Sequence, residues 1–218
     1  MTPRATERRL IETIRRAPAG GPGVRVGIGD DCAVLEPDAG RLLLATTDLM
    51  IEDVHFRRRW AAPGDVGWKS LAVNLSDIAA MGGRPRWALI ALACPAGVGL
   101  EDAEEFYSGL LALASEHGVA VVGGDTAASP AGWLVNVTLL GEAVAAPLLR
   151  STARAGNVVA VTGALGRSAA GLALLESPAV PAGLAPAAGE GLDHLRDLSW
   201  NHIRCHADDA LRSHGHER

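Results

Sequence analysis

The segment from residue 64 to residue 95 changes its hydrophobic spacing once, and this change constrains the fold more than any other feature of the sequence. Its first part, residues 64–82, carries apolar side chains on one stripe at helical spacing, and the pair Gly82-Gly83 favours a helix end. The run RWALIALACP that follows is typical of a buried strand, which Pro95 closes. A helix that leads into a strand in this way predicts a layered fold with helices covering a sheet.

Helix-type and strand-type spacing alternates along the rest of the chain. Helices are expected at 5–16, 101–117 and 165–176, and strands at 24–28, 32–35, 41–47, 119–124, 132–144 and 157–163. The helices are long enough to cover one face of a sheet, so the pattern favours an α+β or an α/β layer architecture.

Composition excludes several classes of protein. The 218 residues, 48% of them hydrophobic, can build a real core, and the net charge of -5 argues against a nucleic-acid partner. No apolar run reaches the roughly 18 to 20 residues that cross a bilayer, and the N-terminus has the pattern of an amphipathic helix rather than a signal peptide. The three cysteines lack metal-type spacing and are expected to be reduced thiols. We therefore expect a soluble, cytoplasmic protein without a membrane partner.

The C-terminal part differs in composition from the rest. The run at 177–191 is rich in Pro, Ala and Gly and is typical of a linker. Five of the seven histidines follow it, on a segment with rough helical spacing. A metal site around His202, Cys205 and His206 is one interpretation, but their spacing matches no closed tetrahedral pattern, so a solvated tail is the alternative.

Carboxylates stand beside apolar segments in four short stretches: GIGDDCAVL, TTD, NLSD and GGDT. Each stretch alone is compatible with a turn, a helix cap or a solvated face. Carboxylates that gather at the ends of strands repel one another unless a cation lies between them. Hydroxyl and carboxylate oxygens suit Mg²⁺ that shares its coordination sphere with phosphate oxygens, and the neighbouring glycines let backbone amides approach a polyanion. The chain has no Walker-type loop, no dinucleotide fingerprint and no kinase catalytic loop.

These motifs carry a resemblance to a known family. GIGDDCAVL, TTDLMIEDVHF, KSLAVNLSDIAAMGGRP and VVGGDT, followed by GEA and R-x3-R-x-G, resemble thiamine-monophosphate kinase. That family belongs to a superfamily with aminoimidazole ribonucleotide synthetase, selenophosphate synthetase and a hydrogenase-maturation protein. The resemblance runs from about residue 5 to residue 176. It implies an α+β fold in which a mixed sheet carries helices on one face and pairs with a second sheet across a homodimer. The implied domains are an ATP- and Mg²⁺-binding domain at 1–146, the start of a second domain at 147–176, and a linker with a divergent tail at 177–218.

The resemblance also implies a reaction and a site. ATP would phosphorylate thiamine monophosphate to thiamine diphosphate, with several Mg²⁺ ions and no catalytic side chain acting as a base. Tyr107 and the Gly124-Asp125 turn would contact the nucleotide, Arg150 would pair with its phosphates, and His55 would contact the thiamine phosphate. The implied metal ligands are Asp31, Thr46, Thr47, Asp48, Asp77 and Asp125.

Two departures from the family pattern stand out. Asp53 occupies a position where the family usually has Gly before VHF, and the family's D-x-S-D-G-L and G-G-E-D-Y stretches are missing, with DLSW at 197–200 only similar to the first. A non-catalytic nucleotide-binding and dimerisation module, or a synthetase that uses another phosphate acceptor, are therefore alternatives to the kinase.

Overall fold

The structure is a computed structural model that describes residues 12, 21–26, 34–143, 145–160 and 166–176. The chain divides into two compact units, Met1–Leu149 and Arg150–Arg218, and each is described by itself. The predicted helix at 5–16, with the exception of Glu12, and the predicted metal site near His202 lie outside the described residues. In the described part of the chain, no helix is long and apolar enough to span a bilayer.

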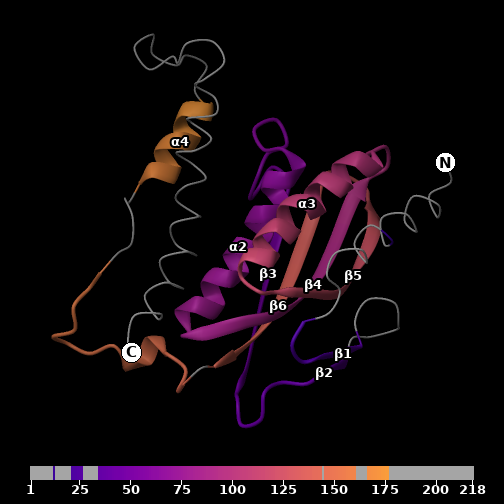
Figure 1. Cartoon of the computed structure of the whole chain (residues 1–218). Coiled ribbons are helices and arrows are strands. Elements are labelled where there is room, and N and C mark those ends of the chain that lie inside the picture. The colour runs from indigo at the N-terminus through magenta and orange to yellow at the C-terminus, as the bar shows by residue number, and fades with distance from the viewer. Residues whose placement is uncertain (1–11, 13–20, 27–33, 144, 161–165, 177–218) are drawn as a thin grey trace. The chain divides into compact units, whose positions relative to one another are not determined.

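A mixed four-stranded sheet forms the centre of the first unit (Figure 1). Its strand order is β3-β6-β4-β5. The pairs β3–β6 and β6–β4 are antiparallel, and the pair β4–β5 is parallel. This confirms the mixed sheet that was expected. The strands are β3 (Leu43–Ile51), β6 (Leu134–Ala143), β4 (Gly83–Pro95) and β5 (Ala120–Ser129).

Two helices, α2 (Pro63–Ala80) and α3 (Leu100–Glu116), lie side by side over one face of this sheet (Figure 1). The side chains between the helices and the strands form the core, and Leu71, Leu75 and Phe106 are fully buried there. The backbones of α2 and α3 approach each other closely because a glycine lies at each point of contact. A Cβ at Gly67 would lie 1.9 Å from a carbonyl oxygen of α3, and one at Gly109 would lie 2.0 Å from a carbonyl oxygen of α2. We call this side of the sheet the covered face.

The opposite side, the open face, carries the short antiparallel pair β1 (Val24–Val26) and β2 (Val34–Leu35) at one end. Val24 and Leu35 pack against Trp87, whose indole nitrogen donates to the Pro22 carbonyl at 3.2 Å. Beside it lies the buried ion pair of Arg86 and Glu142. Elsewhere the open face exposes apolar side chains, and 51% of Leu43, 45% of Leu49 and 37% of Leu89 is accessible to solvent.

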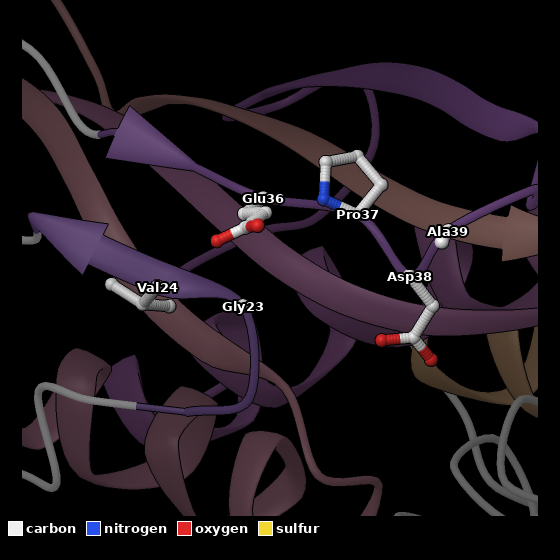
Figure 2. A pocket seen from close by; sticks show the side chains of 6 residues that line it. All are labelled: Gly23, Val24, Glu36, Pro37, Asp38 and Ala39. Atoms are coloured by element: carbon white, nitrogen blue, oxygen red, sulfur yellow. The ribbon is translucent and has the colours of Figure 1, made fainter.

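A hollow of about 320 Å³ lies beside β1 and β2, and Figure 2 shows the side chains that line it. Its carboxylates are those of Glu36 and Asp38, and Asp38 already accepts a hydrogen bond from Arg86 at 3.4 Å. None of the predicted site residues lines this hollow, so we do not assign the candidate site to it. The lining residues are Gly23, Val24, Glu36, Pro37, Asp38 and Ala39.

The structure corrects two predictions about where strands end and one about whether a strand forms. β3 continues through Thr46-Thr47-Asp48 to Ile51, so the TTD motif lies inside a strand and not at its end. β5 likewise continues through Gly124-Asp125 to Ser129, so these residues form no turn. Residues 157–160 form no strand, and Val158 and Val159 are more than 90% exposed, since no strand in the described part of the chain covers them; residues 161–163 of the predicted strand lie outside that part. The second unit contains the short helix η1 (Arg150–Thr152) and α4 (Arg167–Glu176), and α4 confirms the helix expected at 165–176.

Candidate functional site

The three residues of the TTD motif point to both faces of the sheet because side chains alternate along a strand. Thr46 and Asp48 are half-buried on the covered face, and Thr47 between them is exposed on the open face. The motif therefore presents oxygen ligands to two different environments.

On the covered face, Thr46 and Asp48 meet Asp77 of α2. The Thr46 hydroxyl donates to the Asp77 carboxylate at 2.6 Å. Burial raises the pKa of Asp48, the nearby carboxylate of Asp77 raises it further, and His55 opposes the shift. Asp77 also lies near the C-terminal end of α2, where the helix dipole is negative and the last turn has no basic residue. The arrangement concentrates negative charge and would be stabilised by a cation.

On the open face, Thr47 belongs to a small polar network with β6. Its hydroxyl lies 3.1 Å from the Thr138 hydroxyl, and the Asn136 amide donates to the Thr47 hydroxyl at 3.1 Å and to the Asp48 carbonyl at 3.2 Å. Thr138 and Asn136 were not identified from the sequence. Polar residues at alternate positions of NVT, inside an otherwise apolar strand, were the signal that could have found them.

Asp125 lies on the same open face but at the other edge of the sheet. The strand register places Asp125, Ala91, Asn136 and Leu49 in one row across the four strands. With neighbouring strands about 4.8 Å apart, Asp125 is separated from β3 by three spacings, or roughly 14 Å. Side chains from the two edges cannot share one metal ion within a single sheet.

Gly124 lets β5 carry Asp125 close to β4. Its φ is 154°, and a Cβ there would lie 1.9 Å from the carbonyl oxygen of Ile90. Any larger residue would push the strand away from its parallel partner. The predicted contact of Gly124 with a nucleotide stays a prediction, since the structure contains no ligand.

His55 follows β3 on a loop of residues 52–56, which we call the His55 loop. Its ring is exposed, and its Nδ1 atom accepts a hydrogen bond from the Ile51 amide at 3.1 Å. Asp53 has a φ of 64°, a left-handed conformation that favours glycine, which fits the family's usual Gly at this position. The loop places the imidazole close enough to Asp48 to lower the pKa of its carboxyl, against the raising effect of burial and of Asp77.

The remaining predicted site residues stay predictions. Asp31 lies outside the described residues. Arg150 begins η1 in the second unit, whose placement relative to the first unit is not described. Tyr107 is 4% exposed on α3, its ring meets Phe106 edge to face, and burial raises the pKa of its hydroxyl. Its aromatic ring therefore contributes to the core of the first unit.

The oxygen donors fit the chemistry of Mg²⁺, although they do not yet form a complete site. Thr46, Asp48 and Asp77 supply hard ligands in a region of excess negative charge. Within the described part of the chain, however, no three His, Cys, Asp or Glu side chains come close enough to hold one ion. Further ligands would have to come from other residues, from water or from phosphate oxygens.

Comparison with known proteins identifies the family to which the first unit is similar. Residues 29–143 match the family model described as AIR synthase related protein, N-terminal domain. Thiamine-monophosphate kinase of Bacillus subtilis is 41% identical over 167 residues, which are 76% of this chain and 51% of that protein. The chain thus spans about half the length of the curated relatives it matches.

Solved structures show the same fold. Thiamine-monophosphate kinase from Stenotrophomonas maltophilia superposes with a TM-score of 0.75 at 34% identity, covering 93% of this chain and 64% of that one. AaThiL complexed with AMPPCP and TMP superposes with a TM-score of 0.66 at 34% identity, covering 97% of this chain and 64% of that one. Through residues 29–143, this chain belongs to the AIR synthase related protein family.

Proposed function

We propose that this chain contributes the ATP- and Mg²⁺-binding part of a thiamine-monophosphate kinase, which transfers a phosphoryl group from ATP to thiamine monophosphate. The observation that carries the proposal is the cluster of Thr46, Asp48 and Asp77 beside the His55 loop, in a fold similar to that of AaThiL complexed with AMPPCP and TMP. The cytoplasmic location expected from the sequence belongs to the same proposal.

The acceptor's nucleophile is a phosphate oxygen that is already anionic near neutral pH, so the reaction needs no strong base. What the protein must do is hold two polyanions in line and offset their repulsion. Mg²⁺, when bound, would neutralise the phosphate oxygens. Thr46, Asp48 and Asp77 would hold it at the covered face, and Thr47 and Asp125 would hold ligand oxygens at the open face. His55 would donate a hydrogen bond to the acceptor's phosphate.

The separation of the two edges supports a homodimer. Asp125 lies three strand spacings from Thr47 and Asp48 in one sheet, and among the described residues no further strand pairs with β3 or β5. A second copy packed open face to open face, with its β5 edge over the β3 edge of the first, would place Asp125 beside the partner's TTD motif. The exposed Leu43, Leu49 and Leu89 on the open face give such a pairing an apolar surface to bury.

The direct test measures thiamine diphosphate formed from ATP and thiamine monophosphate. The 218-residue chain is assayed alone and with the C-terminal half of a relative, such as the B. subtilis kinase, fused in place of residues 177–218. We expect product from the fusion, dependent on Mg²⁺, and much less from the chain alone. An inactive fusion that folds and still binds Mg-ATP would indicate another phosphate acceptor. A folded fusion that binds no Mg-ATP would contradict the proposal altogether.

A further inference from the structure

The His55 loop is joined by hydrogen bonds to the segment before β6 at its start, Glu52. At its start, the Glu52 amide donates to the Trp133 carbonyl at 2.9 Å, and the Glu52 carboxylate accepts from the Trp133 amide at 2.8 Å. Within the loop, the Asp53 amide donates to the Phe56 carbonyl at 2.8 Å. These bonds join the loop to the segment before β6, but they do not join it to α2.

The contact with α2 is made by Lys69, the single lysine of the chain. Its ammonium donates to the His55 carbonyl at 2.8 Å. The side chain is half-buried, and burial lowers the pKa of the ammonium. No carboxylate among the described residues forms an ion pair with Lys69, so its known partner is the neutral carbonyl of His55. A cation held in this way is costly to bury, which makes a role beyond packing reasonable.

The bond from the Ile51 amide determines which nitrogen of His55 can donate. Nδ1 accepts this bond at 3.1 Å, so it cannot carry a proton. In the neutral imidazole the proton therefore resides on Nε2. Because the ring is exposed, this N–H is available to an anionic oxygen such as one of a phosphate monoester.

We propose that Lys69 is a positioning residue for the acceptor: by holding the His55 carbonyl against α2, it fixes the imidazole with Nδ1 on the Ile51 amide and Nε2–H free for the acceptor's phosphate. The identity of the acceptor rests on the proposed function, but the fixed tautomer does not. Removing the Lys69 bond frees the loop from α2, so the ring can leave the Ile51 amide and exchange its proton between both nitrogens.

A purely structural role for Lys69 predicts a different result. Leu71, Leu75 and Ile78 already anchor α2 in the core, with at most 2% of each exposed. The loss of one hydrogen bond at the half-buried Lys69 should lower overall stability only modestly. The state of the His55 ring separates the two roles, since global stability does not report on a tautomer.

The test records the ring nitrogens of His55 by NMR in the ¹⁵N-histidine-labelled chain at pH about 8.5, well above the ordinary histidine pKa of about 6.5. His55→Gln identifies the signals. In the unchanged chain we expect one non-protonated Nδ1 and one protonated Nε2. In Lys69→Met the two shifts should move toward each other as the tautomers exchange. Lys69→Arg, which keeps a donor, should restore most of the original pattern.

Asp65→Asn is the matched control on the same helix. The Asp65 carboxylate accepts from the Ala62 amide at 3.0 Å at the start of α2, so this variant weakens the helix without touching the His55 loop. It should leave the ring signals unchanged. The proposal is wrong if the unchanged chain carries the proton on Nδ1, if Lys69→Met leaves both shifts in place, or if Asp65→Asn alters them equally.

Ligand binding provides a second readout. In the active fusion, Lys69→Met should weaken thiamine monophosphate binding about tenfold, because the His55 ring no longer holds its Nε2–H toward the phosphate and one charge-assisted hydrogen bond is lost. The affinity for Mg-ATP should stay within about twofold of the original. If the tautomer is fixed in the unchanged chain and lost in Lys69→Met, but the unchanged fusion does not bind thiamine monophosphate, then Lys69 positions His55 and the chain is not part of a thiamine-monophosphate kinase. Equal losses for both ligands would reject a specific role for Lys69 at the acceptor.

Discussion

The two faces of the four-stranded sheet differ in their side chains and in how closely these are packed. The covered face is a close-packed core in which α2 and α3 leave room for no more than glycine where their backbones meet. The open face exposes leucines between polar side chains, among them Thr47, Asn136 and Asp125. Residues that fix the fold and residues that require a ligand or a partner thus share the same strands on opposite sides. Changes in the packed core of the covered face should lower stability, whereas changes at the polar cluster of Thr46, Asp48 and Asp77 or on the open face should weaken binding or assembly.

Gly67→Ala should have the largest effect on stability. The added Cβ would lie 1.9 Å from the Phe106 carbonyl oxygen, and a backbone atom cannot rotate away. We expect the free energy of unfolding to fall by about 3 kcal/mol, measured by urea denaturation. Gly99→Ala is the control, because a Cβ there has its nearest neighbour at 3.9 Å. A loss below about 1 kcal/mol for Gly67→Ala would mean that the two helices are less tightly packed than described.

Asp48→Asn should abolish Mg²⁺-dependent nucleotide binding without a comparable loss of stability. The substitution removes a ligand charge but also relieves its repulsion with Asp77, so the metal-free chain should unfold at the same temperature or slightly higher. Mg-ATP affinity should fall at least about 100-fold. Thermal shifts with and without Mg-ATP measure both effects. An unchanged shift on addition of Mg-ATP would contradict the metal site.

Leu49→Arg examines the open face. Leu49 is 45% exposed, so the substitution should change the unfolding free energy of the monomer by less than about 0.5 kcal/mol. If a second copy covers this face, the buried arginine should weaken dimerisation at least about tenfold in sedimentation equilibrium. Leu172→Arg is matched in exposure, also 45%, but lies on α4 in the second unit. Equal dimerisation of both variants would exclude this face as the dimer interface.

Asp53 should give the smallest effect. Its φ of 64° favours glycine and tolerates aspartate or asparagine better than alanine. We expect Asp53→Ala to lower the free energy of unfolding by about 1 kcal/mol, while Asp53→Gly and Asp53→Asn change it by less than about 0.5 kcal/mol. Chemical denaturation of the three variants measures the order. Equal stability of the alanine and glycine variants would mean that the loop relaxes to another conformation.

The sequence predicted the elements better than their ends. Helical spacing at 64–82 and 101–117 and the alternating run at 132–144 correspond to α2, α3 and β6, because burial on one side imposes that spacing. The motifs TTD and GGD were wrongly placed at strand ends. Glycine and aspartate disfavour strands locally, but hydrogen bonds to β6 and β4 continue through them.

The geometry of the site was harder to predict than its residue types. The row that joins Leu49, Asn136 and Asp125 follows from strand order and register, which one sequence does not specify. Spacing alone therefore suggested one cluster of metal ligands. In the structure Asp48 and Thr47 lie on opposite faces of β3, and Asp125 lies on β5 at the other edge of the sheet. Lys69 was overlooked because it lies within an amphipathic helix, where a lysine is ordinarily a solvated side chain.

We propose that one site combines the β3 edge of one copy with the β5 edge of another. Subunit mixing tests it most directly, with Asp48→Asn and Asp125→Asn chains unfolded together, refolded and titrated with Mg-ATP. If each site uses Asp48 from one chain and Asp125 from its partner, random pairing makes half of the dimers mixed, and each mixed dimer has one intact site of two. We then expect recovery of about a quarter of the wild-type sites, although each variant alone binds none. No recovery from a mixture shown to contain mixed dimers would contradict it, because every site would then lie within a single chain.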